Sequence, residues 1–458
     1  MSKSRDLTEG SVSGHLVRLG LPTIIAVAGI LSVSMADAYF LGQLGTDELA
    51  AISFTFPVLM VVASLGIGMA AGAASVVSRA IGRGGQANIN RLATDSLLIA
   101  FIVSTVVAIV GWLTVRPFFA MLGADGAVLD LVTGYMRLWY LGAPLLAVPM
   151  VAAGLIRANG DAVAPSVAML IGSLLNVALD AILIFGWGPI PELGILGAGW
   201  AQIFARIFSA SVTVAIVVFR ERLITWCLPT AVEFTRSLGS IARVGVPATF
   251  SNMINPISVS VVTAILATTY GKEAVAAFGV ATRVEAFTTI PMLALSSAIG
   301  PVAGQNWGRD RRDRTRRAMR DTFWFVILCG LILGGSFFMF GDVFVAFFTS
   351  DSVVENLAVS YLTFVGITLG GYGVVITASA ALNAIDKAIV GLLITVLRSF
   401  VLYVPLAVAA VMIGPPWLVF AGIALANVLS GAVSGVLAFR MAQDVRKPAA
   451  EGLAAEVG

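Results

Sequence analysis

Two aspartates that could bind a cation lie inside long apolar stretches of the sequence. Asp37 lies in LSVSMADAYFLGQL, Asp180 lies in GSLLNVALDAILIFGW, and Asn176 precedes Asp180 by about one helical turn. Because residues four apart share a helix face, Asn176 and Asp180 point to the same side. Ionisable groups at membrane depth are costly and usually functional. The set predicts a cation-coupling site that takes up H+ between two carboxyl groups, or Na+ among carboxylate and amide oxygens.

The second half of the chain carries another group of polar residues inside apolar stretches. Asn252 and Asn255 lie three residues apart, Glu285 lies in ATRVEAFTTIP, and Arg398 lies in ITVLRSFVLYVP. We predict that these four residues line a polar substrate cavity. The alternatives are a structural ion pair for Glu285 and for Arg398, and hydrogen bonds that join helices for the two asparagines.

The composition shows which elements must position these residues. Of the 458 residues, 59% are hydrophobic and only 12% are charged, and the mean hydropathy is +0.97. Soluble domains contain about 25% charged residues, so this chain is predicted to lie in a bilayer. The net charge of +3 is too small and too scattered for a nucleic-acid partner. One histidine, two isolated cysteines and the lack of a phosphate-binding Gly-rich motif argue against an enzyme, a bound cofactor or drive by ATP.

Twelve apolar stretches are long enough to cross a bilayer, which needs roughly 20 apolar residues per helix. The chain is therefore predicted to be an all-α polytopic membrane protein. We place the twelve transmembrane helices at 15–42, 50–77, 93–118, 127–156, 162–188, 195–219, 243–270, 274–304, 321–347, 357–384, 388–412 and 417–440.

Basic residues gather in the loops on one side of the predicted bilayer. With the N-terminus inside, the inner loops contain Arg79, Arg83, Arg157 and the arginine-rich segment 308–320, whereas the outer loops are mostly acidic. Positive loops stay in the cytoplasm, so both termini are predicted to be cytoplasmic. The arginine-rich segment is also expected to contact anionic membrane lipid.

The two halves of the sequence repeat each other at a nearly constant offset. Matching pairs are Arg18–Pro22 with Arg243–Pro247, Gly45–Ala51 with Gly271–Ala277, and Ile156–Ala158 with Leu382–Ala384. An even number of helices per repeat predicts two parallel six-helix bundles with a substrate site between them, which is a transporter architecture. We predict an N-terminal lobe at 1–219, a linker at 220–242, and a C-terminal lobe with a short tail at 243–458.

The polar cluster of the first half has no counterpart in the second. The positions equivalent to Asp37, Asn176 and Asp180 are Thr263, Leu402 and Leu406. A purely structural requirement would more often occur in both halves, so the asymmetry favours an ion site. The alternatives are a carboxylate that reaches the interface at the end of a helix for Asp37, and an interhelical hydrogen bond for Asp180.

Several stretches together resemble the multidrug and toxic compound extrusion (MATE) family, within the multidrug/oligosaccharidyl-lipid/polysaccharide exporter superfamily. They are ADAYFLGQLGTDELAA, LLNVALD, GILGAGWAQ, ATRVEAFTTIPMLALSSAIGPVAGQNWGR and ALNAIDK, and they extend over essentially the whole chain. The resemblance implies a V-shaped pair of bundles in a bacterial inner membrane. It implies export of amphipathic, often cationic, drug-like compounds in exchange for H+ or Na+.

The resemblance also implies roles for individual residues. Asp37, Asn176 and Asp180 fall where similar members carry a cation site, with Gln202 at a position that is often Thr. Pro22 falls where such members bend the first helix. Asn255 replaces a Glu that another branch of the family uses, so that branch's second acidic site is expected to be missing.

The sequence is expected to encode a monomeric secondary transporter, and the alternatives are a flippase, an intramembrane enzyme and a channel. A flippase for a lipid-linked oligosaccharide would need basic groups facing the cavity, and Arg137, Arg206 and Arg398 are the few candidates. Arg137 and Arg206 lie near predicted interfaces, and structural roles are favoured for them. An intramembrane enzyme would need a convergent nucleophile or metal set, and a channel would not need this repeat.

Overall fold

The computed structural model describes residues 6–227 and 229–443, and nearly all of this part of the chain is helical. The helices are α1 (Val12–Gly42), α2 (Thr46–Arg83), α3 (Gln86–Met121), α4 (Gly126–Leu141), α5 (Ala143–Ala158), α6 (Val163–Phe185), α7 (Gly194–Ala215), α8 (Ala231–Tyr270), α9 (Lys272–Gly308), α10 (Arg312–Ala346), α11 (Ser352–Gly366), α12 (Leu369–Ala384), α13 (Ala388–Val396), α14 (Val404–Ile413) and α15 (Pro416–Gln443). A π-helical turn extends α7, and another joins α13 to α14.

These helices make twelve candidate membrane spans, as predicted. Ten are single apolar helices, counting α13 and α14 as one, and two are bent pairs. The pair α4 and α5 bends by 43°, and the pair α11 and α12 bends by 55°. Each pair corresponds to one predicted span, at 127–156 and at 357–384. Pro144, in the first turn of α5, has no backbone N–H to donate to the Tyr140 carbonyl, so it interrupts the helical hydrogen bonds at the break around Gly142.

Part of the predicted linker 220–242 is helical. Helix α8 begins at Ala231 rather than at 243, because Thr230 and Glu233 form a capping box that satisfies the free backbone N–H groups of its first turn. Pro22 and Pro247 lie inside α1 and α8, and both helices are continuous through them.

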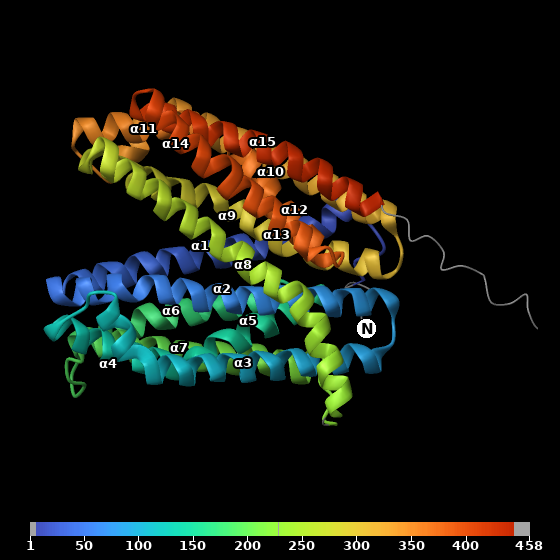
Figure 1. The fold of residues 1–458 in the computed structure, drawn as a ribbon. Helices are drawn as coiled ribbons and strands as arrows, with labels where there is room; N and C mark the ends of the chain where they lie inside the picture. Colours follow the sequence, from blue (N-terminus) through green and yellow to red (C-terminus); the bar gives the residue numbers. More distant parts are fainter. Residues whose placement is uncertain (1–5, 228, 444–458) are drawn as a thin grey trace, which may run out of the picture.

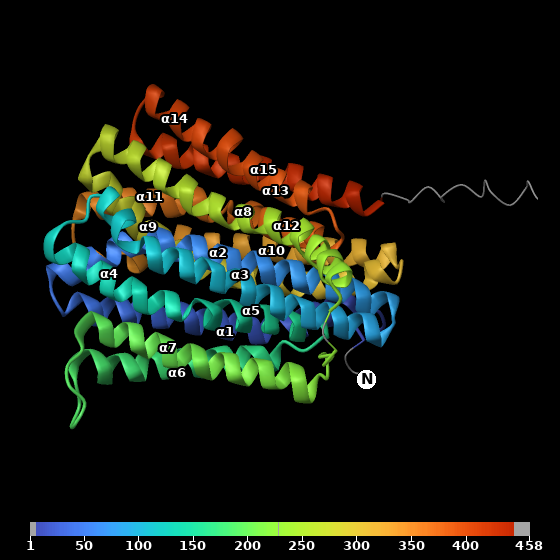
Figure 2. The ribbon, with the colours of Figure 1, turned by 60° about the horizontal axis from the view of Figure 1, so that its bottom comes forward.

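The helices form two bundles that meet along one side. Figure 1 shows α2–α7 in the lower bundle and α8–α15 in the upper one, with α1 beside the junction. In the view of Figure 2 the two bundles overlap, with α6 and α7 at one edge and α14 and α15 at the other. We call helices α1–α7 the N bundle and helices α8–α15 the C bundle. The first turns of α1 depart from this division, since Leu16 and Leu19 are buried in the hydrophobic cluster formed mainly by the C bundle.

The bundles contact each other most closely at the end of the molecule that carries the Arg79–Gln86 and Gly308–Arg312 turns, here called the basic face. Arg79 forms an ion pair with Asp386 at 3.2 Å, and the Ser75 hydroxyl donates to the Asn383 carbonyl at 2.5 Å. Gly82 and Gly308 allow α2 and α9 to approach with their backbones in contact: a Cβ on Gly82 would overlap the Gln305 carbonyl. This close packing closes the basic face.

The residues that precede α1 add a strap across this junction. The Leu7 backbone N–H donates to Gln305 Oε1 at 3.1 Å, and Gln305 Nε2 donates to the Ala158 carbonyl of α5 at 2.7 Å. Asn306 Nδ2 donates to the Leu7 carbonyl at 3.1 Å, and Ser13 donates to Asp321 of α10 at 2.8 Å. The start of α1 is thus fixed to the C bundle.

The glycine contact at the basic face can be tested with Gly82→Ala. The added methyl group would meet backbone that cannot turn aside, so we expect a loss of about 1–3 kcal/mol of stability. Thermal unfolding in detergent measures the change. Gly279→Ala, in α9, is the control, because a Cβ there meets nothing within 4 Å. Equal melting temperatures for the two variants would contradict the assigned contact.

Candidate functional site

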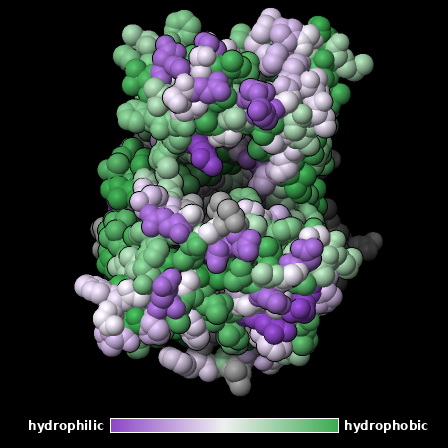
Figure 3. All heavy atoms as spheres, turned by 90° about the vertical axis from the view of Figure 1, so that its left-hand side faces the viewer, coloured by the Kyte–Doolittle hydropathy of each residue, from purple (hydrophilic) through white to green (hydrophobic). Residues whose placement is uncertain are grey.

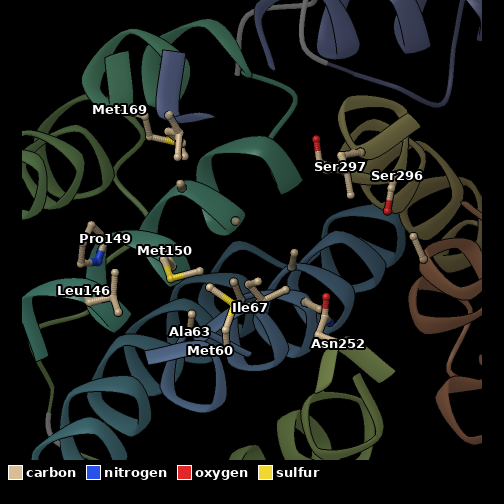
Figure 4. A pocket seen from close by; sticks show the side chains of 18 of the residues that line it. Met60, Ala63, Ile67, Leu146, Pro149, Met150, Met169, Asn252, Ser296 and Ser297 are labelled. Atoms are coloured by element: carbon tan, nitrogen blue, oxygen red, sulfur yellow. The ribbon is translucent and has the colours of Figure 1, made fainter. Parts of the chain in front are cut away.

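The two bundles enclose a cavity of about 970 Å³. Figure 3 views the molecule from the end opposite the basic face and shows the hollow between the bundles. Figure 4 shows the apolar wall and the polar wall of this cavity. The apolar wall of the N bundle includes Met60, Ala63, Ile67, Leu146, Pro149, Met150 and Met169, and the C bundle contributes Asn252, Ser296 and Ser297.

Asp37 of α1 and Asp180 of α6 lie together at the N-bundle side of the cavity. Their carboxyl groups are close enough to interact electrostatically, and Asn176 Nδ2 donates to Asp180 Oδ2 at 2.9 Å. Asp37 and Asn176 line the cavity, whereas the side chain of Asp180 is buried behind it. Within the described part of the chain, Oδ1 of each aspartate is buried without a hydrogen-bond donor. Because buried acceptors without donors are costly, the pair suits a bound proton or cation.

A chain of polar side chains leads from this pair into the cavity. Tyr135 of α4 is close enough to both aspartates to interact electrostatically, and its hydroxyl accepts a hydrogen bond from Gln202 Nε2 at 3.3 Å. Gln202 Oε1 accepts from Arg206 Nη2 at 3.0 Å. The Arg206 guanidinium also lies over the Trp139 ring, 4.9 Å from its centroid. Arg206 and Gln202 both line the cavity, so the aspartate pair is connected to the cavity wall.

Arg398 is the centre of a second polar cluster, on the C-bundle side. Its Nε and Nη2 donate to Asn427 Oδ1 at 3.2 and 3.0 Å, and its Nη1 donates to Asn255 Oδ1 at 3.1 Å. The guanidinium lies 3.8 Å from the Tyr372 ring centroid. All of these partners are neutral.

The predicted cavity residues separate into two groups. Asn252, Asn255 and Arg398 line the cavity, but Glu285 lies outside its lining. Glu285 instead accepts a hydrogen bond of 2.5 Å from the Tyr361 hydroxyl, a satisfied structural contact for a carboxyl group inside a bundle.

Two arginines differ from the sequence-based expectation. Arg206, read as structural, lines the cavity. Arg157, counted among the inner-loop residues, also lines it, because the last turn of α5 reaches the cavity floor. The repeat contained a signal for Arg157: its equivalent in the second half, Asn383, lines the cavity too. Arg137 is exposed and lies over Trp112, outside the cavity lining.

The chain is similar to a family of membrane transporters over most of its length. A family model described as MatE matches residues 22–182 and 247–409, one match in each half. A FAD transporter of Shewanella oneidensis is 32% identical over 453 residues, which is 99% of this chain and 100% of the relative. A probable multidrug resistance protein of Bacillus subtilis is 25% identical over 375 residues, 81% of this chain and 79% of that protein.

A solved structure of a MATE transporter from Vibrio cholerae has the same architecture. It superposes with a TM-score of 0.89 at 28% sequence identity, and the match includes 94% of this chain and 97% of that one.

The Arg398 cluster predicts a stability change on Asn427→Ala. The substitution removes the acceptor of two guanidinium N–H groups from a buried site, so we expect a loss of about 1–3 kcal/mol. Thermal unfolding in detergent is the measurement, and Asn427→Asp, which restores an acceptor, should recover stability. Asn252→Ala is the control, because the Asn252 amide donates only to the Ala248 carbonyl of its own helix. Melting temperatures equal to that of the parent for both Asn427→Ala and Asn252→Ala would contradict the role assigned to Asn427 in the Arg398 cluster.

Proposed function

Because this chain belongs to the MatE family of transporters, we propose that it is a secondary active exporter that exchanges an amphipathic solute for a cation by alternating access. The observation that carries the proposal is the carboxyl pair of Asp37 and Asp180. It adjoins a large cavity between two bundles, and its two buried Oδ1 atoms have no donor in the described residues. Such a pair gains stability when it takes up a cation, which gives the cavity a way to sense an ion gradient.

We propose that the coupling ion is H+, with Na+ as the alternative. One proton shared between two facing carboxyl groups satisfies both. Sodium prefers several oxygen ligands, and no third Asp, Glu, His or Cys joins the pair within the described ranges. The Gln202 amide oxygen is also engaged, since Oε1 accepts a hydrogen bond from Arg206, and Asn176 turns its Nδ2 rather than its oxygen toward Asp180.

The orientation in the membrane follows from the arginines. Placing the basic face in the cytoplasm agrees with the preference of positive loops for that side, and puts both chain termini there, in a bacterial inner membrane. The cavity would then open outward in this structure while the glycine-packed basic face is closed. The two lobes, 1–219 and 243–458, would rock against each other in the opposite state, with Pro22 as the hinge of α1 because it removes a backbone hydrogen bond there.

Two substrate classes have support. The multidrug relatives favour amphipathic, often cationic, drug-like compounds, and the mixed apolar and polar cavity walls suit such molecules. The relative that transports FAD favours a flavin dinucleotide, and the arginines in the cavity suit its phosphate groups. The flippase alternative shares the need for cavity arginines.

The aspartate pair is tested by Asp37→Asn and Asp180→Asn in proteoliposomes. Either change leaves a single carboxyl group and removes the site at which two of them share a proton, so gradient-driven transport should fall at least about tenfold while the folded yield is kept. Asp130→Asn is the control, because this exposed carboxylate of α4 pairs with Arg116 away from the cavity. Parent-like transport by both site variants would rule out the assigned coupling site.

The coupling ion is tested with two separate gradients. A pH gradient in sodium-free buffer should drive transport of ethidium or FAD, and a sodium gradient at fixed, equal pH should give no more than about a tenth of that rate. The expectation rests on the two-carboxyl site, which holds one proton without further ligands. Transport by the sodium gradient alone would replace H+ with Na+ in the proposal.

A further inference from the structure

The charged side chains that line the cavity are mostly positive. They are Arg157, Arg206, Arg398 and Asp37, and no lysine or glutamate occurs among the described lining residues. We infer that the cavity binds an anionic amphiphile, a molecule with phosphate groups joined to a ring system or an apolar chain. This inference rests on the proposed function and names its substrate class.

None of the three arginines is neutralised by a carboxylate within 4 Å in the described part of the chain. Arg398 donates to the oxygens of Asn427 and Asn255, and Glu285, the acidic group of the neighbouring helix, is held by Tyr361. Arg206 donates to Gln202 and to the Gly142 carbonyl, and no described hydrogen bond or ion pair engages Arg157. Neutral groups orient Arg206 and Arg398, and all three arginines keep their positive charge available to a ligand.

The cost of these charges supports a ligand-binding role. A guanidinium at membrane depth is expensive unless it is paired or lines a water-filled path. An arginine with a structural role would normally have a buried carboxylate partner, as Arg91 has in Asp95 at 3.4 Å near the basic face. Three arginines in one cavity, none with a carboxylate within 4 Å in the described residues, are better explained by a negative ligand, and guanidinium groups bind phosphate oxygens through paired hydrogen bonds.

The positions of the arginines indicate that the anionic part of the ligand would lie between the two bundles. Arg206 belongs to α7 of the N bundle and Arg398 to the π-helical turn between α13 and α14 of the C bundle, so an anion between them contacts both bundles. Arg157 stands at the floor. Trp139 and Tyr372, which carry guanidinium groups over their rings, and the methionines of the N-bundle wall offer surfaces for an aromatic or lipid portion. A volume of about 970 Å³ admits a molecule of dinucleotide size.

Equilibrium binding to the purified protein in nanodiscs tests this inference with matched probes. FAD and riboflavin share the isoalloxazine ring but differ in the diphosphate, and ethidium is a cationic ring system. We expect FAD to bind at least about tenfold more tightly than riboflavin, and ethidium to bind weakly. Farnesyl diphosphate as a competitor distinguishes a diphosphate on a lipid chain from one on a nucleotide; displacement of FAD would assign the diphosphate group itself as the recognised element.

The variants Arg206→Gln and Arg398→Gln should each weaken FAD binding about tenfold or more and leave riboflavin binding within about twofold. Arg137→Gln, outside the cavity, should change neither, and Arg206→Lys and Arg398→Lys should keep part of the affinity that the glutamine variants lose. The inference would be overturned if ethidium bound more tightly than FAD, or if both glutamine variants bound FAD as tightly as the parent. Binding is measured without a gradient, so arginine-dependent binding without gradient-driven transport would contradict only the proposed function.

Discussion

Contact between helix backbones at the basic face is the constraint on which the rest of the structure depends. Side chains would hold α2 apart from α8 and α9, but Gly72 and Gly82 let these helices touch where a Cβ would overlap the opposing carbonyl groups. Small residues give such close helix approach in membranes, where no hydrophobic force draws helices together. Because the bundles are joined so tightly here, they can separate toward the other end and leave the cavity between them.

The two walls of the cavity carry charged groups of opposite sign in different surroundings. On the N-bundle side, two carboxyl groups face each other and have unmet hydrogen-bonding capacity, which makes their state depend on what they bind. On the C-bundle side, Arg398 is surrounded by amide oxygens and aromatic rings that fix its position without removing its charge. Within the N bundle, Gln202 lies between the aspartate pair and Arg206, because it contacts both Tyr135 beside the aspartates and Arg206 on the cavity wall.

The sequence predicted the features that depend on composition and period. Twelve spans and two bundles follow from apolar length and the repeat, and Asp37 and Asp180 stood out because carboxylates are rare in such stretches. Arg157 was missed because an arginine at the end of a span normally marks the membrane edge. The bends at Gly142 and near Thr368 were missed too, since hydrophobicity does not report helix direction. The Arg206 environment depends on packing between helices far apart in sequence, which no local pattern encodes.

The strap before α1 makes this helix a direct connection between the two bundles. Its first turns are fixed to the C bundle through Leu7, Gln305 and Asp321, whereas its later part carries Asp37 against Asp180 of the N bundle. Helix α1 is therefore attached to both bundles. Pro22 lies between the two points of attachment, where the missing backbone hydrogen bond makes the helix easier to bend. In the proposed transport cycle, a rotation of one bundle relative to the other would therefore change the position of Asp37 relative to Asp180, and a change in the charge of that pair would act on the same helix.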